Sequence, residues 1–394
     1  MDVKHLKKID NILKEMTENG FVAGANCLVL ENGKEVYYGE TGYIDLEKKI
    51  PVKDDSIFRL YSMTKPVTSA AVMLLAQDGL IDLNQAVGDF IPSFRNQTVI
   101  DKGNRYAVKR AMKIKDLLNM TAGLTYGGEG NAPEVMTARL AAEGISRLGT
   151  DNEMSTMEFV SRLGEIPLLF NPGEHFQYSY CADVLGALVE TVSGMRFGDF
   201  LKKRIFEPLG MDDTGFYVPA EKRDRFTKVY EDYEGNLREF TYNHLIINLP
   251  MDHEPAFQSG GAGLCTTIRD YAKFATMLLN KGIYKGVRVM EEGSVRYMTT
   301  GDMEAVPKED LKSWDSMDGF VYANLLRVMK EPGKAMTFSV EGEYGWDGWL
   351  GPYFINDPKH KITILHMIQK TNAGTTSYMR RIRNVVYAAA EEKE

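Results

Sequence analysis

The two ends of the chain carry the same kinds of hydrophobic pattern in opposite order, and this feature narrows the possible folds more than any other. Residues 2–20 place apolar side chains at helical spacing, and the segment that begins at Val22 has a strand-like pattern. Toward the other end, several strand-like segments precede a helical pattern over residues 377–390. This order predicts one antiparallel sheet that both ends build, flanked by helices. The expected fold class is therefore α/β, in the α+β sense.

Several strands can be assigned individually from the pattern. Residues 27–30 and 36–38 flank the pair Asn32-Gly33, which tolerates positive φ, and together they predict a hairpin. Further strands are expected over residues 320–328, 335–340, 344–349, 352–355 and 362–368.

The middle of the chain has a different character. It holds mostly helical stretches and long loops, with helices expected over residues 114–119, 156–163, 183–192 and 268–279. We therefore predict a discontinuous sheet domain, residues 1–85 plus 300–394, with an inserted, mainly helical region, residues 86–299. A chain of 394 residues is long enough for this arrangement.

Charge and hydropathy argue against several classes of partner. Lys and Arg number 47 against 55 Asp and Glu, a net charge of −8, whereas nucleic-acid binding needs a clustered basic face. The longest apolar stretch, residues 70–76, is too short to span a bilayer, and the charged first residues do not resemble a signal peptide. We expect a cytoplasmic protein without nucleic-acid or membrane partners, and a homo-oligomer remains open.

Neither a metal nor another cofactor is expected. Cys27, Cys181 and Cys265 are far apart and form no Cys-x-x-Cys motif, and the six His residues form no His-Glu-x-x-His motif. The sequence also has no glycine-rich loop of the kind that holds phosphates. Buried free thiols are the simpler interpretation of three isolated cysteines.

The first candidate catalytic motif is Ser62-Met63-Thr64-Lys65, which precedes a helical run over residues 66–77. If Ser62 begins the helix, Lys65 projects from the same face one turn later. A lysine whose pKa is lowered by burial can accept the serine proton, and a helix N-terminus favours a developing oxyanion. Serine is also a favoured N-cap, so the motif alone fits a structural role equally well.

Two further segments could carry chemistry. A tyrosine on the loop 172–180, before a helix, can move protons if cationic neighbours lower its pKa, although most loop tyrosines only pack. The segment Gly345-Trp346-Asp347-Gly348-Trp349 lies on a late strand, where glycines let a substrate or a second backbone approach closely. The alternative is a strand corner whose tryptophans pack on the core.

Together, the three segments resemble those of serine hydrolases in the class C β-lactamase and penicillin-binding-protein superfamily. The resemblance is greatest to its esterase branch, the family VIII carboxylesterases. It covers roughly residues 20–370 and includes the segments 60–66, 78–83, 114–124, 205–211 and 259–264. It implies a β-lactamase-like fold and a covalent acyl-enzyme mechanism.

The resemblance also implies roles for particular residues. Ser62 would be the nucleophile, Lys65 its activator, and Tyr178 the proton shuttle; Tyr180 is the alternative shuttle, although only Tyr178 matches the esterase pattern in register. The backbone N–H groups of Ser62 and Trp349 would form the oxyanion hole. Residues expected to contact the substrate are Tyr126, Trp314, Trp346, Asp347, Gly348, Trp349 and Tyr353.

Two departures from the β-lactamase pattern bear on the substrate. Tyr178-Ser179-Tyr180 replaces Tyr-x-Asn, and Trp346-Asp347-Gly348 replaces Lys-Thr-Gly. Exchanging the lysine for tryptophan and an acidic residue should disfavour an anionic substrate near that strand. The leading hypothesis is hydrolysis of neutral, small-molecule esters with short or medium acyl groups. Acyl transfer, weak β-lactamase or D-amino-acid peptidase activity, and a non-catalytic penicillin-binding-like sensor are the alternatives.

Overall fold

The computed structural model describes residues 1–101, 103–301, 308–311 and 314–390. Within these residues the main sheet has eight strands in the order β12-β13-β14-β15-β16-β1-β2-β3, and neighbouring strands are antiparallel. The strands are β1 (Gly24–Glu31), β2 (Lys34–Asp45), β3 (Ile50–Pro51), β12 (Phe320–Ala323), β13 (Leu326–Met329), β14 (Tyr344–Asp347), β15 (Tyr353–Asp357) and β16 (Ile362–Ile368). The predicted sheet built from both ends of the chain is confirmed.

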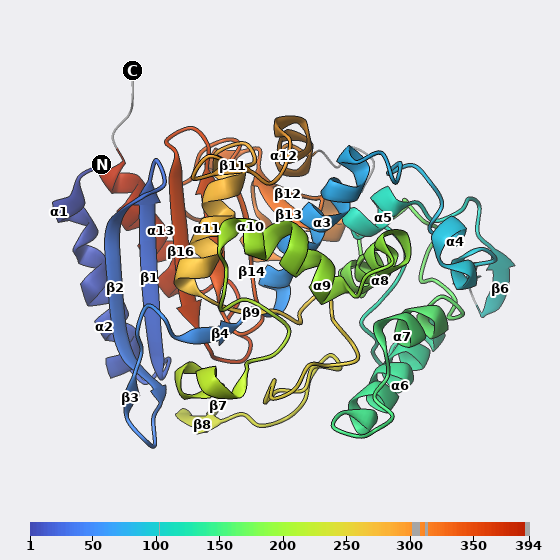
Figure 1. Ribbon diagram of the computed structural model, residues 1–394, viewed down its shortest axis with the longest axis horizontal. Helices are drawn as coiled ribbons and strands as arrows, with labels where there is room; N and C mark the ends of the chain where they lie inside the picture. Colours follow the sequence, from blue (N-terminus) through green and yellow to red (C-terminus); the bar gives the residue numbers. More distant parts are fainter. Residues whose placement is uncertain (102, 302–307, 312–313, 391–394) are drawn as a thin grey trace.

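The two ends of the chain meet at the centre of this sheet. Strand β1 pairs with β16, with Ala25 opposite Ile368, and the backbone N–H of Asp2 donates to the carbonyl of Ala389 at 2.8 Å. The helices α1 (Val3–Leu6), α2 (Lys8–Glu18) and α13 (Ser377–Ala389) therefore lie together on one face, at the left of Figure 1.

The local turn chemistry explains the hairpins. Asn32 and Gly33 have φ of 53° and 71°, so the predicted β1–β2 hairpin is confirmed. The prediction of one strand over 320–328 is wrong, because Asn324 and Leu325 also adopt positive φ and divide the segment into the hairpin β12–β13. The strand predicted over 335–340 is absent from the described structure. There, Thr337 and Phe338 donate instead to the side chain of Asn384.

The opposite face of the sheet carries the larger core. Helix α11 (Ile268–Leu279) packs on β15 and β16, and α3 (Lys65–Gln77) and α8 (Cys181–Ser193) lie beyond it. Helices predicted in the middle of the chain are confirmed in α5, α7, α8 and α11. The remaining α-helices are α4 (Val87–Phe90), α5 (Ile114–Leu118), α6 (Ala132–Arg147), α7 (Thr156–Leu163), α9 (Phe197–Leu201), α10 (Glu207–Leu209) and α12 (Glu292–Thr299).

One short strand pair connects the beginning of the chain to its middle, and three others are local hairpins. Strand β4 (Ile57–Arg59) pairs with β9 (Cys265–Thr267), more than 200 residues later in the sequence. The other short pairs are β5 (Thr98–Asp101) with β6 (Asn104–Ala107), β7 (Tyr230–Tyr233) with β8 (Asn236–Glu239), and β10 (Ile283–Tyr284) with β11 (Val287–Arg288). The division into a sheet domain and an inserted region stays a prediction.

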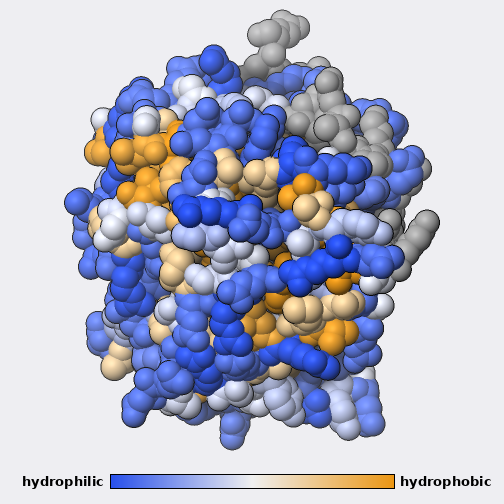
Figure 2. All heavy atoms as spheres, turned by 90° about the vertical axis from the view of Figure 1, so that its right-hand side faces the viewer, coloured by the Kyte–Doolittle hydropathy of each residue, from blue (hydrophilic) through white to orange (hydrophobic). Residues whose placement is uncertain are grey.

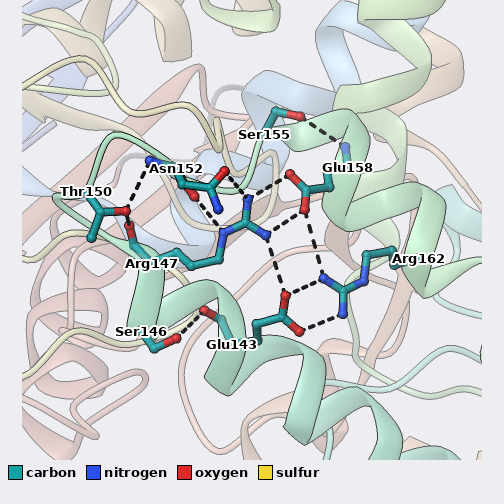
Figure 3. Close-up of polar contacts among 8 residues, drawn as sticks. All are labelled: Glu143, Ser146, Arg147, Thr150, Asn152, Ser155, Glu158 and Arg162. Carbon is teal, nitrogen blue, oxygen red and sulfur yellow. Dashed lines mark hydrogen bonds and ion pairs between the residues drawn. The ribbon is translucent and has the colours of Figure 1, made fainter.

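Helices α6 and α7 form an outer hairpin that ion pairs hold together. Arg147 donates to both carboxylate oxygens of Glu158 at 2.6 and 3.0 Å, and Arg162 donates to both of Glu143 at 2.6 Å (Figure 3). Figure 2 views the molecule from this side and shows a mainly hydrophilic surface with small hydrophobic patches. No helix among the described residues has the length and apolar character needed to cross a membrane.

Candidate active site

Ser62 lies in a tight turn between β4 and α3. Ser62 belongs to the 3₁₀ turn η1 (Tyr61–Thr64), and α3 follows directly from Lys65. Residues three apart eclipse one another in a 3₁₀ turn, so Lys65 still reaches the Ser62 side chain. Tyr61 has a φ of 45°, a strained conformation for a bulky residue, directly before the serine.

The elements around this turn hold it firmly. The backbone N–H of Leu60 donates to the carbonyl of Leu264 at 2.8 Å, as a continuation of the β4–β9 pairing. The guanidinium of Arg59, which is buried, donates to the carbonyls of Leu249 and Thr227. A strained residue persists only where its surroundings fix it in this way.

Lys65 is completely buried, and within the described part of the chain the hydrogen-bond partners of its amine are neutral groups. Nζ donates to Ser62 Oγ at 3.1 Å, to the Tyr126 hydroxyl at 3.1 Å and to the carbonyl of Gly261 at 2.8 Å. Burial lowers the pKa of Lys65 to about 7, against the opposing attraction of the Asp183 carboxylate. At neutral pH, a large fraction of this amine is therefore unprotonated and able to accept the Ser62 proton.

Tyr178 lies beside this pair. Its ring centre is 4.5 Å from Lys65 Nζ, and Trp346 Nε1 donates to its hydroxyl at 3.0 Å. Burial raises the pKa of Tyr178 well above its usual range, although hydrogen bonds with Ser62 and Trp346 oppose that shift. The condition that cationic neighbours lower this pKa is not met, because burial raises the pKa and the charged neighbours that contribute, Asp347 and Asp183, raise it further. Tyr178 is thus a neutral hydroxyl that can relay a proton.

Tyr180 does not take part in this arrangement. Its side chain is buried against Phe159 and Tyr126, with ring centres 4.9 and 4.6 Å away, and its hydroxyl has no hydrogen-bond partner among the described residues. Trp314, in contrast, lies at the site with its ring centre 5.0 Å from that of Tyr178. Tyr126 is also at the site, through its hydrogen bond from Lys65.

The third motif passes directly against the serine turn. A Cβ at Gly348 would lie 2.1 Å from the carbonyl oxygen of Leu60, so only glycine allows this close approach. The ring of Trp349 then packs on Tyr61 at 5.1 Å and stacks on His244 at 4.2 Å. The backbone N–H of Trp349 makes no hydrogen bond to a described residue, which leaves it free for a ligand.

Two residues predicted to contact substrate lie on the opposite face of the sheet. Successive side chains of a strand point to opposite faces, so Trp346 faces Tyr178 while Asp347 faces away. Asp347 accepts a hydrogen bond at 2.6 Å from Arg327, which is buried. Tyr353, paired with Asp347, is fully buried in the core beneath α2 and α13. Both placements correct the sequence prediction.

This placement also corrects part of the argument about substrate charge. The negative charge of Asp347 is paired with Arg327 behind the sheet, which offsets its repulsion of an anionic substrate at the site. The structure leaves the other part of that argument unchanged. Trp346 stands in place of the lysine of the β-lactamase motif, and the indole of Trp346 is directed to Tyr178.

Two residues of the site were not assigned a role from the sequence. Gly261 supplies the carbonyl that accepts from Lys65, and Asp183 is a buried carboxylate in the first turn of α8. Both residues lie in segments on which the family resemblance rests, and this resemblance was the one sequence feature that could have marked them as part of the site. Among the described residues, no group of three or more His, Cys, Asp or Glu side chains could hold a metal ion.

Comparison with known proteins now identifies the family. The family model described as Beta-lactamase matches residues 9–388. The chain belongs to the beta-lactamase family. An uncharacterized protein of Mycobacterium tuberculosis is 30% identical over 91% of this chain and 88% of its own length. The esterase EstB of Burkholderia gladioli is 27% identical over 97% of this chain and 95% of its own length.

A solved structure shares the whole architecture of this beta-lactamase family member. It is that of EstCE1, described as a hydrolase with promiscuous acyltransferase activity, with a TM-score of 0.83 and 23% identity over 98% of this chain and 99% of the other. The predicted fold class and the resemblance to the esterase branch are confirmed. The protein is a beta-lactamase-like hydrolase.

Proposed function

We propose that this protein is a serine carboxylesterase that cleaves neutral esters through a covalent acyl-enzyme on Ser62. The observation that carries the proposal is the buried Lys65, whose Nζ lies 3.1 Å from Ser62 Oγ. Neutral hydrogen-bond partners hold the amine, and burial brings its pKa to about 7. A serine is a weak nucleophile until a neighbouring base accepts its proton, and this lysine is placed and tuned to do so.

The reaction follows from these positions. Lys65 accepts the Ser62 proton while Oγ forms a bond to the ester carbonyl carbon, and the backbone N–H groups of Ser62 and Trp349 stabilise the oxyanion. As the carbon–oxygen bond to the alcohol breaks, Tyr178 delivers a proton to the leaving oxygen and is reprotonated from Lys65. A water molecule then attacks the acyl carbon and gives its proton to the same relay. As the bond from that carbon to Ser62 Oγ breaks, the relay returns the proton to Oγ and the acid is released.

The substrate class follows from the side chains around Ser62. Tyr126, Trp314 and Trp346 surround Tyr178 and offer aromatic surface. Among the described residues, Lys65 is the only cationic group in this hydrogen-bonded cluster. We therefore infer an uncharged ester with a short or medium acyl group. The similarity to the esterase EstB supports the cleavage of an ester.

The test is covalent labelling of the serine. Wild-type protein, Ser62→Ala and Ser69→Ala are incubated with a fluorophosphonate and weighed intact by mass spectrometry. Ser69 is the matched control because it is a buried serine on α3 whose hydroxyl has no hydrogen-bond partner among the described residues. One adduct is expected on wild type and on Ser69→Ala, and none on Ser62→Ala. Absence of any adduct, together with no turnover of p-nitrophenyl esters, would contradict the proposal.

Acyl transfer is the second candidate, and the aromatic surroundings of Ser62 favour it. Transfer competes with hydrolysis when the site keeps water from the acyl-enzyme. The EstCE1 hydrolase, which has the same fold, is described as having promiscuous acyltransferase activity. Product analysis with added alcohols separates the two, because a new ester appears only if transfer occurs. Turnover of nitrocefin at rates comparable with ester turnover would instead favour β-lactamase activity.

A further inference from the structure

Asp183 is a buried carboxylate that the mechanism above leaves without a role. It lies in the first turn of α8, five residues after Tyr178, and only 1% of it is exposed. Its Oδ1 accepts hydrogen bonds from Ser259 Oγ at 2.5 Å and from the Gly261 N–H at 3.2 Å. Its Oδ2 has no hydrogen-bond partner among the described residues. Burying an incompletely satisfied carboxylate is costly, and this cost points to a role for Asp183 at the site.

The turn that Asp183 holds is the one that contacts Lys65. The Gly261 N–H faces Asp183, and the Gly261 carbonyl accepts the hydrogen bond from Lys65 Nζ at 2.8 Å. The same turn is tied to α3, because Thr68 Oγ1 donates to the Gly260 carbonyl at 2.6 Å. A shift of the carboxylate would therefore move the carbonyl that orients the lysine.

Close packing makes this coupling stiff. A Cβ at Gly260 would lie 2.2 Å from the carbonyl oxygen of Ala182, so the turn sits directly on the start of α8. A Cβ at Gly261 would lie 2.8 Å from Asp183 Oδ2 and 3.3 Å from the Tyr126 hydroxyl. The carboxylate, the tyrosine hydroxyl and the turn therefore converge beside the lysine amine.

The charges that face Lys65 come from few elements. The groups whose negative charge would raise the pKa of Lys65 are Asp183 and Cys181 on α8 and Asp347 on β14, and Asp183 exerts the largest of these effects. The thiol of Cys181 is neutral, since burial raises its pKa to about 12. Asp347 is paired with Arg327 behind the sheet. Burial raises the pKa of the Asp183 carboxyl above its usual range. In its ionised form, Asp183 is the remaining negative charge that opposes the loss of the Lys65 proton on burial.

We propose that Asp183 is a positioning residue that fixes both the location and the charge state of Lys65, through the 259–262 turn and through its own carboxylate. The inference rests on the proposed acyl-enzyme mechanism at Ser62. Without the charge of Asp183, the buried lysine loses its proton at lower pH and becomes a weaker base. Without the hydrogen bonds that hold the 259–262 turn, Lys65 loses its orientation, but its pKa does not change.

The test separates these two effects in a pH profile. For Asp183→Asn, the rise of kcat/KM with pH is expected to move to lower pH by about one unit, with a plateau several-fold below wild type. Thr68→Val is the matched control, because it removes an uncharged hydrogen bond from the same turn. It is expected to lower the plateau without moving the inflection. An unmoved inflection in Asp183→Asn, or an equal shift in Thr68→Val, would overturn the role of Asp183.

A second variant keeps the proposal testable if Asp183→Asn does not fold, and a second measurement distinguishes its failure from that of the proposed function. If Asp183→Asn does not fold, Asp183→Ser removes the same charge with a smaller side chain, and the same shift is expected. The rate of Ser62 labelling by a fluorophosphonate is followed over the same pH range. If wild type forms no adduct, the proposed function fails; if every variant forms it with one common inflection, only the role of Asp183 fails.

Discussion

Two clusters of polar side chains, one at the surface and one at the candidate active site, differ in whether their cationic groups are paired with carboxylates. Between α6 and α7, Arg147 and Arg162 each form a bidentate pair with a glutamate on the surface (Figure 3). At the candidate active site, Lys65 is fully buried, and its partners among the residues that the structure describes are a serine, a tyrosine and a carbonyl, all neutral. The charges of the two surface arginines are therefore paired with opposite charges, whereas the buried charge of Lys65 has no directly bonded counter-ion among the described residues.

This difference separates a structural role from a chemical one. The carboxylates of the surface cluster have lowered pKa values because the paired guanidinium groups stabilise their charge, so they stay ionised throughout the neutral range. The Lys65 amine has a pKa near 7 because burial disfavours its charge. A group that changes charge at neutral pH can act as acid and base, but its burial costs stability. The two clusters should therefore respond to mutation in opposite ways.

The largest effect is expected for Lys65→Met. Ester turnover should fall by roughly 10²- to 10⁴-fold, because the base is lost. The melting temperature should rise, because an apolar side chain replaces a buried amine. In wild type, the unfolded chain holds the lysine proton up to about pH 10.5 and the folded chain only to about pH 7. The stability gain of the variant is therefore greatest below pH 7 and disappears as the pH approaches 10.5.

Melting temperatures measured from pH 6 to pH 10 check this expectation. Lys273→Met is the matched control, because Lys273 is partly exposed and paired with Asp270 at 2.8 Å. It should show no gain in stability at any pH. A Lys65→Met variant that is less stable than wild type at pH 7 would contradict the comparison between the two clusters.

The next effect concerns the two tyrosines of the second motif. Tyr178→Phe removes the hydroxyl that accepts from Trp346 and should lower turnover roughly 10²- to 10⁴-fold. Tyr180→Phe should stay within about threefold of wild type, because its hydroxyl has no hydrogen-bond partner among the described residues. Steady-state hydrolysis of one p-nitrophenyl ester by both variants decides the matter. The reverse order would transfer the proton relay to Tyr180.

The sequence predicted the sheet well because strand alternation and Asn-Gly turns are local signals. It failed where a distant partner decides the outcome. The segment 335–340 alternates like a strand, but its groups bond with Asn384 on α13 rather than with a neighbouring strand. The faces of Asp347 and Tyr353 likewise depend on the register between β14 and β15, which the sequence does not reveal.

In the candidate site too, contacts between residues close in the sequence were predictable and contacts between distant residues were not. Ser62 and Lys65 are three residues apart, so their contact follows from local geometry alone. Tyr178 was assigned by resemblance, and the structure brings it to the pair through Trp346. Asp183 received no role because its partner Ser259 comes 76 residues later in the chain. The contact between Asp183 and the 259–262 turn follows only from the fold, which brings the start of α8 next to that turn.

The smallest effect is expected at the surface cluster. Glu158→Gln removes one partner of Arg147, yet it should lower the melting temperature by no more than about 2 °C, because exposed ion pairs contribute little. The loss should shrink further at high salt, and ester turnover should not change. A fall of more than about 5 °C, or a tenfold loss of turnover, would mean that this cluster also supports the site. In that case the two clusters could no longer be treated as independent.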